Sequence, residues 1–357
     1  MEGRVYARNY LLIKQNHKRG TYMKNTIKTI GVIVFTAVIG FSMAGCDGTD
    51  SPATNGVRVF SMACNHANNS TFPTTLGNRA FIEYINRETN GHIIIELAAR
   101  GLEEDTLQAT KNGTIAFNRL PVITLASDYT NIGALAMPFI YRDREHKLNV
   151  LDGPIGDAAL GMLTGQNLLG LAWYDAGFRN FYSTSPIRTV GDMYGMSIRI
   201  MNTPLMREMI NLLGAEYDTR SFGQVYYALR DDYIHGAENN WPSFVQGNHY
   251  RVASYITLSG HIASPEMLLV NTGVWNSFSA AEQDIIRSAA QYAAAVQRAE
   301  WLVSEKAAME RAYSYVEIIE LEADARQAFV TAMAPLFETY GLFAQYATTI
   351  GAIRAVQ

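Results

Sequence analysis

The apolar positions of the chain alternate between short extended runs and segments with helical spacing. The extended runs predict strands at 57–63, 92–97, 115–125, 168–173, 196–201, 252–256, 267–271 and 316–321. Apolar residues that recur every three or four positions predict helices at 76–89, 106–111, 142–161 (around a turn at Gly153-Pro154), 205–213, 222–230, 280–312 and 323–340. A strand, a helix and a second strand follow one another between 57 and 97, and this order implies parallel pairing. The expected fold class is therefore α/β.

The helix predicted at 280–312 is long for a single small lobe. Ser279 and Glu282 form the capping-box pattern at its start. A helix of about 30 residues spans about 45 Å. We therefore expect it to brace two lobes, which a chain of 357 residues can form.

The stretch from Tyr194 to Trp241 carries the first candidate binding residue, Arg199. Arg199 lies in the short apolar strand at 196–201, and Thr203 and Pro204 then supply a helix N-cap and a favoured first helical residue. Arg199 is thus near the carboxyl end of a strand, where open α/β sheets bind ligands. Its planar guanidinium matches a carboxylate. A surface or inter-lobe salt bridge is the alternative interpretation.

Further polar residues follow other predicted strands. Arg179 comes after the strand at 168–173 and would add a second cation, with a salt bridge again as the alternative. The run Glu238-Asn239-Asn240-Trp241 offers amides for hydroxyl groups and an indole face for a sugar ring, although Asn-Asn also forms turns. The remaining candidates are Asn118, Arg119 and His66. A histidine in a loop such as that of His66 is more often structural than catalytic.

The first 45 residues predict a lipoprotein signal segment. Lys24 and Lys28 precede an apolar run at 30–43 that is too short to span a bilayer. Met43-Ala-Gly-Cys46 resembles a lipobox, so Cys46 would be the acylated first residue of the mature chain and 46–56 a flexible tether. A plain secretory signal is the alternative. Residues 1–22 do not resemble a signal, which makes Met23 a candidate start.

Removal of the signal segment changes the charge. Residues 1–45 hold seven of the 29 Lys and Arg and one of the 33 Asp and Glu, so the net charge falls from −4 to −10. An acidic exported protein is not a nucleic-acid binder. The chain has two cysteines, so lipidation of Cys46 leaves Cys64 alone and excludes an intramolecular disulfide.

The sequence contains no recognisable catalytic or cofactor motif. It has no nucleophile elbow, P-loop, HExxH or glycine-rich dinucleotide fingerprint, and no cysteine–histidine spacing typical of zinc sites. These observations favour binding without chemistry, and without a cofactor or metal.

Several stretches, in order, resemble the DctP-type substrate-binding proteins of tripartite ATP-independent periplasmic (TRAP) transporters. They read FIEYINRETNGHIIIEL, EEDTLQATKNGTIAFNRL, ALAMPFIYRDREH, GLAWYDAGFRNFY, MSIRIMNTPLMREMINLLGAEY and FGQVYYALRDDYIHGAENN, and the resemblance covers the chain from Val57 onward. It implies two α/β lobes with a ligand cleft between them, joined by crossing segments and a long helix.

The resemblance also implies roles for single residues. The arginine that pairs with the ligand carboxylate corresponds to Arg199, a second contact to Arg179, and a hydroxyl-binding asparagine to Asn239, close to Trp241. Asn240 stands where the family usually has proline. The resulting AENNWPS run resembles a subgroup that leans toward hexuronates such as glucuronate or galacturonate.

That subgroup would add Asn118, Arg119 and His66 to the ligand contacts. Glu103 is a further candidate, but it opens the all-acidic run Glu103-Glu104-Asp105 where the family often has a basic residue. Phe117 stands where a methionine is common. Both departures bear on ligand specificity and not on the fold.

The combined expectation is a monomeric extracytoplasmic receptor, lipid-anchored through Cys46, that is not an enzyme. It would pass a small organic acid to the small and large TRAP membrane subunits. Residues 57–176 with 262–300 would form one lobe, and 177–261 with 301–357 the other. A C4-dicarboxylate ligand, with Arg119 or Arg179 on its second carboxylate, is one alternative. An exported sugar-acid enzyme using Glu238, Glu103 or His66, and a receptor that signals without transport, are the others.

Overall fold

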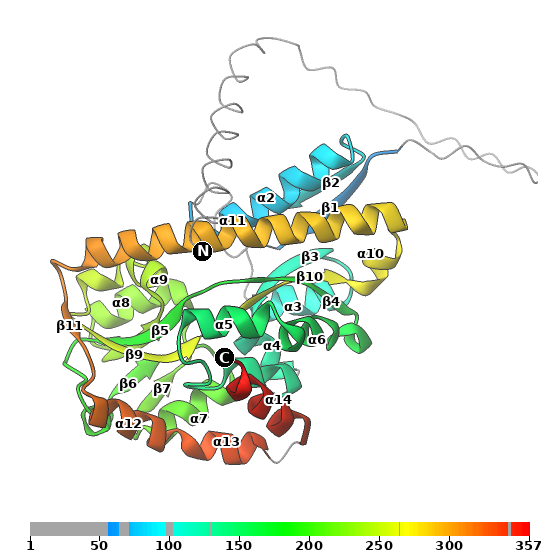
Figure 1. Cartoon of the computed structure of the whole chain (residues 1–357). Coiled ribbons are helices and arrows are strands. Elements are labelled where there is room, and N and C mark those ends of the chain that lie inside the picture. Colours follow the sequence, from blue (N-terminus) through cyan, green and yellow to red (C-terminus); the bar gives the residue numbers. More distant parts are fainter. Residues whose placement is uncertain (1–55, 64–70, 98–102, 129, 264, 342–343) are drawn as a thin grey trace, which may run out of the picture. The chain divides into compact units, whose positions relative to one another are not determined.

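The computed structural model describes residues 56–63, 71–97, 103–128, 130–263, 265–341 and 344–357 (Figure 1). Val57–Gln357 forms a compact unit by itself. The predicted signal segment, Cys46 and His66 lie outside the described residues. Within the described ranges, no helix combines the length and the apolar character that crossing a membrane requires.

The first sheet has the strand order β2-β1-β3-β10-β4. Its strands are β1 (Arg58–Met62), β2 (Ile93–Leu97), β3 (Phe117–Pro121), β4 (Leu168–Tyr174) and β10 (Glu266–Asn271). β1 pairs in parallel with β2 and β3, which confirms the predicted strand–helix–strand unit. β10 inserts antiparallel between β3 and β4, and every one of its residues is buried. A strand covered on both faces explains its unbroken apolar run.

The second sheet has the order β11-β9-β5-β8-β6-β7. Its strands are β5 (Phe178–Ser183), β6 (Ser197–Arg199), β7 (Glu216–Asp218), β8 (Gly236–Asn239), β9 (Tyr255–Ala263) and β11 (Glu317–Ile319). β6 pairs in parallel with β7 and β8, and β9 with β11, whereas β5 is antiparallel to β8 and β9. Two mixed sheets thus confirm the α/β class.

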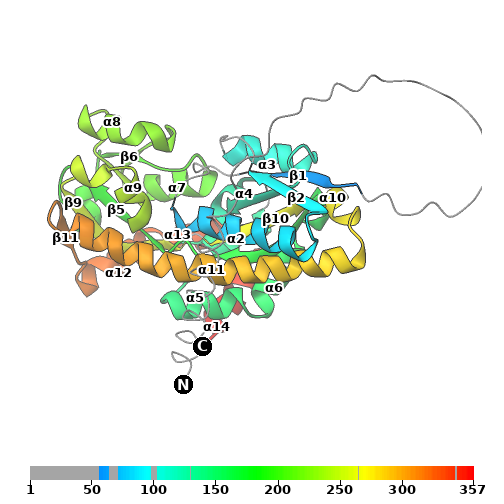
Figure 2. The ribbon, with the colours of Figure 1, turned by 90° about the horizontal axis from the view of Figure 1, so that it is seen from above.

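The helices cover both sheets (Figures 1 and 2). They are α2 (Pro73–Glu88), α3 (Glu103–Lys111), α4 (Val122–Asp128), α5 (Arg144–Leu151), α6 (Pro154–Gly161), α7 (Pro204–Leu212), α8 (Val225–Arg230), α9 (Trp241–Gln246), α10 (Thr272–Asn276), α11 (Ala280–Ala312), α12 (Ala323–Ala332), α13 (Ala334–Gly341) and α14 (Ala344–Ala355). The 3₁₀ turns are η2 (Thr130–Ala136), η3 (Thr164–Gln166), η4 (Val190–Met193), η5 (Phe222–Gln224) and η6 (His249–Arg251).

The long helix α11 is confirmed with its predicted start. Ser279 and Glu282 form the capping box, in which Glu282 N donates to Ser279 Oγ (3.3 Å). α11 packs against α2, which covers the first sheet, and against α9, which covers the second. One helix therefore braces both sheets.

Two crossing segments also join the sheets. The chain passes from β4 to β5 through Asp175–Gly177, and it crosses back between the end of β9 and the start of β10. The crossings run antiparallel side by side, because Tyr174 pairs with Glu266 and Phe178 with Ala263. Gly177 has a φ of 64°, and a Cβ there would lie 2.7 Å from a Glu305 oxygen. Only glycine fits this position without displacing its neighbours.

Several segments differ from the predicted elements. The strand predicted at 252–256 is β9, which begins at Tyr255 and runs to Ala263, and β5, β7, β8, α9 and α10 were not predicted. The run at 115–125 divides into β3 and α4, because Val122, Ile123 and Leu125 are all fully buried and an unbroken apolar run does not separate strand from helix. The helix predicted at 323–340 divides into α12 and α13, since Pro335 fits only the first turn of a new helix. The C-terminal helix α14 was not predicted.

The C-terminal helices contact elements of both halves. α12 and α13 pack against η4 and α7, beside the second sheet. α14 packs instead against η2 and α6, in the part of the chain that carries the first sheet. The predicted boundaries put all of 301–357 with the second lobe. They remain a prediction, and the contacts of α14 differ from it.

Candidate functional site

Arg179 and Glu238 form a buried ion pair between two neighbouring strands of the second sheet, β5 and β8. Arg179 donates from Nε to Glu238 Oε2 and from Nη2 to Glu238 Oε1 (2.7 Å), so the pairing is bidentate. Burial alone would raise the pKa of Glu238, but Arg179 and His261 outweigh it and hold that pKa below its usual value. Glu238 is therefore ionised at neutral pH and orients the Arg179 guanidinium.

His261 packs against this pair from β9. Its ring stacks on Phe181 with the centroids 4.1 Å apart, and its Nε2 lies 3.5 Å from Glu238 Oε2. Its Nδ1 lies 2.8 Å from the Ser259 hydroxyl. Burial lowers the pKa of His261, although Glu238 acts in the opposite direction. The ring is therefore neutral at neutral pH.

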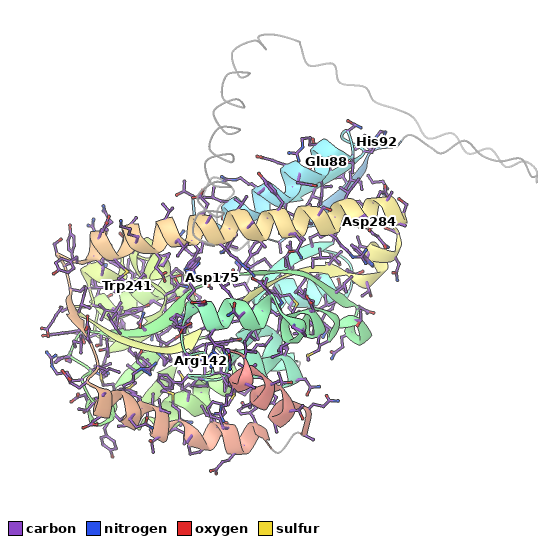
Figure 3. All side chains as sticks on the ribbon, viewed as in Figure 1. Glu88, His92, Arg142, Asp175, Trp241 and Asp284 are labelled. Atoms are coloured by element: carbon purple, nitrogen blue, oxygen red, sulfur yellow. The ribbon has the colours of Figure 1, made fainter. Side chains whose placement is uncertain are left out.

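Asn239, at the end of β8, contacts the same arginine. Its side-chain oxygen accepts from Arg179 Nη1 (3.1 Å) and from the Asn240 main-chain N–H (2.9 Å). The amide therefore directs its NH₂ end away from Arg179. Asn240 is the N-cap of α9 and accepts from Ser243 N (2.9 Å). Trp241, labelled in Figure 3, begins α9. It is 4% exposed and packs edge-on against Phe244 in the core.

Arg199 is the last residue of β6, followed by the start of α7. Thr203 and Pro204 occupy the predicted N-cap and first helical positions. Arg199 donates from Nε to the Arg220 carbonyl (2.9 Å), and Arg220 is held by Asp218. Because β6 and β8 are parallel and Arg199 pairs with Ala237, Asn239 lies two residues further along the neighbouring strand. Arg199 and Asn239 thus lie near the carboxyl ends of two neighbouring strands, with their Cα atoms offset by about 7 Å along the strand direction.

The charge of Arg199 also acts on the α8 side of this sheet. His249 lies 2.7 Å from the Tyr182 hydroxyl, and burial followed by the charge of Arg199 lowers the pKa of His249 to about 3. His249 therefore stays neutral. It lines an open pocket of about 520 Å³ together with Phe222, Gly223, Tyr226, Tyr227, Gly247, Asn248 and Arg251.

Arg119 forms a second buried ion pair, in the first sheet. Its Nη1 lies 2.9 Å from Glu266 Oε1, and Thr74 donates to Glu266 Oε2 (3.1 Å). Asn118 accepts from the Arg119 main-chain N–H (2.8 Å) and donates to the Thr110 hydroxyl (3.0 Å). Arg119 is 5% exposed and Glu266 is 8% exposed. Buried polar side chains of β3, β10 and the helices beside them are therefore linked by hydrogen bonds at this place.

The two ion pairs lie on either side of the crossing segments. Arg179 pairs in register with Ile262, four residues before Glu266. Four residues of extended chain span about 13 Å. Arg179 of the second sheet and Glu266 of the first, which pairs with Arg119, therefore lie at the two ends of the same crossing segment.

A third charged cluster lies at the first crossing itself, where Figure 3 shows Asp175 between α5 and α11. Lys147 Nζ lies 2.6 Å from Asp175 Oδ1, and Arg144 Nη2 lies 2.6 Å from Asp175 Oδ2. Gln297 of α11 donates to the Asp175 carbonyl (2.6 Å) and accepts from the Asp175 main-chain N–H (2.9 Å). Burial opposes ionisation of Asp175, but Lys147 and Arg144 hold its pKa below the usual value. The cluster ties the crossing to both helices.

Two predicted site residues have no described side chain, and several charged residues of the clusters were not predicted. His66 lies outside the described residues, and Glu103 begins α3 but its side chain is not described. Sequence reasoning missed Glu266 as a partner of Arg119, and Lys147 with Asp175 at the crossing. The available signal was a charged residue at the edge of an apolar run, as in SPEMLLVN. Among the described residues, no group of three His, Cys, Asp or Glu is placed to hold a metal ion.

The chain is similar to known proteins over most of its length. A "Solute-binding protein" of Chromohalobacter salexigens is 30% identical over 274 residues, which cover 76% of this chain and 81% of that protein. A TRAP periplasmic solute binding protein of Xanthobacter autotrophicus, solved with bound β-D-galacturonate, superposes with a TM-score of 0.79 at 34% identity and covers 84% of this chain and 100% of its own.

A second solved structure agrees with the first. The TRAP periplasmic solute binding protein of Chromohalobacter salexigens with bound D-glucuronate gives a TM-score of 0.80 at 28% identity, over 84% of this chain and 100% of that one. The two-sheet architecture is therefore the TRAP receptor fold. Residues 64–342 match the DctP family, described as bacterial extracellular solute-binding protein, family 7, and the chain belongs to that family.

Proposed function

We propose that this protein is the receptor of a TRAP transporter and binds a hexuronate such as glucuronate or galacturonate. The observation that carries the proposal is the edge where Arg199 and Asn239 meet on parallel strands, beside Arg179. Arg199 pairs with the ligand carboxylate and Asn239 with a hydroxyl. The similar structures with bound galacturonate and glucuronate support the choice of ligand.

The other predicted contacts complete the ligand's surroundings in this proposal. Arg119 and Asn118 bind from β3 of the first sheet, and Arg179 binds from β5 of the second. His66 and Glu103 are further ligand contacts in this proposal. Trp241 was predicted to offer its indole face to a sugar ring, but it is 4% exposed and packs against Phe244, so in this proposal it supports Asn239 from the core. The ligand then passes to the small and large membrane subunits, and the receptor acts as a monomer.

A C4-dicarboxylate is the second candidate, and the charges argue against it. Such a ligand needs a cation for its distal carboxylate, and Arg119 and Arg179 are the two predicted for that role. Each of them already forms an ion pair with a carboxylate of the protein, Glu266 or Glu238. Because Glu266 and Glu238 already offset the charges of these two arginines, neither arginine offers an unbalanced positive charge to a second ligand carboxylate. This favours a ligand with one carboxylate.

A sugar-acid enzyme is the candidate from another class. Glu238 was a possible general acid, but its pKa is held below the usual value after the opposing effect of burial. A group that stays ionised at neutral pH is a poor proton donor. Both oxygens of Glu238 also accept hydrogen bonds from Arg179, which makes Glu238 a poor candidate for a general base.

Isothermal titration calorimetry of the purified protein tests the proposal. We expect saturable 1:1 binding of glucuronate or galacturonate, with succinate, malate and fumarate at least tenfold weaker. Recovery of the uronate unchanged after incubation with stoichiometric protein excludes the enzyme. Tight binding of a C4-dicarboxylate with no uronate binding would replace the proposed ligand.

We also propose that Cys46 carries the lipid that holds the receptor at the membrane. The Met43-Ala-Gly-Cys46 run motivates this proposal. Replacing Cys46 with serine is expected to move the protein from the membrane fraction to the soluble extracytoplasmic fraction, because two acyl chains anchor far more strongly than the protein surface. Cys64→Ser is the matched control and should stay with the membrane. Incorporation of labelled fatty acid into Cys46→Ser at the level of the unmodified protein would contradict acylation of Cys46.

A further inference from the structure

The carboxylate of Glu266 has both oxygens engaged. Arg119 Nη1 lies 2.9 Å from Oε1, and the Thr74 hydroxyl donates to Oε2 (3.1 Å). The three groups come from β3, α2 and β10, so three separate elements determine the position of one carboxylate. Burying a carboxylate is costly unless it is paired and hydrogen-bonded, and Glu266 makes both kinds of contact. The pair sets one acidic group directly against the guanidinium of Arg119.

The unit also lies at a fixed place relative to the crossing. Glu266 opens β10 directly after the second crossing and is in register with Tyr174 at the end of β4 and with Pro121 at the end of β3. The Pro265 carbonyl accepts from Val122 N (2.9 Å), which ties the same point to the start of α4. The carboxylate thus lies at the junction of the first sheet with the crossing segments.

We propose that Glu266 determines the specificity of the receptor by neutralising and orienting Arg119. The proposal rests on the function proposed above, in which Arg119 contacts the ligand, and it adds that this contact is at the ligand end remote from the carboxylate held by Arg199. A guanidinium paired with Glu266 donates hydrogen bonds to a hydroxyl or a ring oxygen there. A second carboxylate at that end would meet the negative charge of Glu266 beside the positive charge of Arg119. Hydroxyl-ended acids are thereby selected over acids with a carboxylate at each end.

Glucuronate and glucarate are the probes that separate these two ligand classes. They share one six-carbon skeleton, and glucarate carries a second carboxylate in place of the aldehyde end. Calorimetry gives the ratio of the glucarate Kd to the glucuronate Kd for each variant. Glu266→Gln keeps the size and an acceptor oxygen but removes the charge. We expect it to lower this ratio at least tenfold relative to the unmodified protein, and to make glucarate binding more sensitive to salt.

Arg119→Gln tests the same idea in the opposite direction. It leaves Glu266 charged without its arginine, so the ratio is expected to rise at least tenfold. The double variant Arg119→Gln with Glu266→Gln has neither charge and should return the ratio to within about threefold of the unmodified protein. Thr74→Val removes a hydrogen bond to Glu266 and no charge, and is the matched control, with an expected ratio within about threefold of the unmodified protein.

A purely structural role of Glu266 would weaken both ligands equally and leave the ratio unchanged in every variant, and that result overturns the proposal. If Glu266→Gln does not fold, the rise expected for Arg119→Gln decides the question alone, and an unchanged ratio there is equally negative. A different outcome concerns the underlying function. If the unmodified protein binds neither probe, the hexuronate proposal itself fails.

Discussion

Replacing Lys147 with methionine is expected to lower the free energy of unfolding by about 3 kcal/mol. The side chains of Lys147 and Asp175 are both 0% exposed, and their charged atoms are 2.6 Å apart. Methionine fills a similar volume but leaves the buried Asp175 carboxylate with reduced compensation. Loss of one partner from a buried pair costs about 3–5 kcal/mol. We expect the lower end because Arg144 also pairs with Asp175. Urea denaturation measures the effect.

Two controls separate burial from charge. Asp175→Asn combined with Lys147→Met removes the stranded charge, so the double variant should be more stable than Lys147→Met alone. Arg188 pairs with Glu317 on the surface, and their side chains are 55% and 51% exposed. Arg188→Met should therefore cost less than about 1 kcal/mol. A similar loss for Arg188→Met and Lys147→Met would contradict the assigned role of the buried pair.

The effect of Lys147→Met should also depend on pH. The pKa of Asp175 is lowered in the folded protein, because Lys147 and Arg144 outweigh the effect of burial. A lowered pKa contributes stability at pH values above the unfolded pKa, and that contribution is lost as the pH falls through the folded pKa. The difference between the unmodified protein and Lys147→Met should therefore be largest near neutral pH and smaller in acid. Urea titrations at pH 7 and at about pH 3, which is below the unfolded pKa of an aspartate, measure this trend.

The cluster of Lys147 and Asp175 could not be predicted from the sequence, whereas much of the fold could. The capping box at Ser279, the cap at Thr203 and the strand–helix–strand order depend on neighbouring residues, so local patterns predicted them and the structure agrees. The Lys147–Asp175 pair joins positions 28 residues apart across a crossing. No local periodicity specifies such a contact, because it depends on how α5 packs against the crossing.

The candidate site shows the same division. Arg199 could be placed at a strand end from the pattern of 196–201 followed by a helix cap, and β6 and α7 confirm that placement. The partner acids could not be assigned, because Glu238 and Glu266 approach Arg179 and Arg119 only through the strand order. The prediction of one strand over 115–125 was wrong for a different reason. Complete burial of this run removes the periodicity that distinguishes a strand from a helix.

Replacing Arg199 with alanine is expected to weaken binding of glucuronate or galacturonate about a thousandfold. Removal of one partner from a desolvated charge pair costs about 2–5 kcal/mol, and about 4 kcal/mol corresponds to three powers of ten in Kd. Arg199 is 7% exposed, so a carboxylate bound to it is largely shielded from water. Without the guanidinium, the ligand carboxylate would lose water and gain no ion pair. Calorimetry with the uronate measures the loss.

The fold itself should tolerate this change better than binding does. The hydrogen bond from Arg199 Nε to the Arg220 carbonyl contributes about 1 kcal/mol net in a typical case. Arg199→Ala should still unfold cooperatively, and urea denaturation measures its stability beside the binding loss. Arg188→Ala removes an equal charge from an exposed ion pair and should bind the uronate as the unmodified protein does.

Arg199→Lys distinguishes a carboxylate-binding fork from a simple positive charge. Lysine keeps the charge but has no planar pair of donors, so it cannot form the bidentate contact with a carboxylate. We expect Arg199→Lys to bind the uronate more tightly than Arg199→Ala and at least tenfold more weakly than the unmodified protein. Equal affinity for the lysine variant and the unmodified protein would show that charge alone suffices. Unchanged binding by Arg199→Ala would place the ligand carboxylate elsewhere, and Arg179 and Arg119 would then be the next arginines to replace.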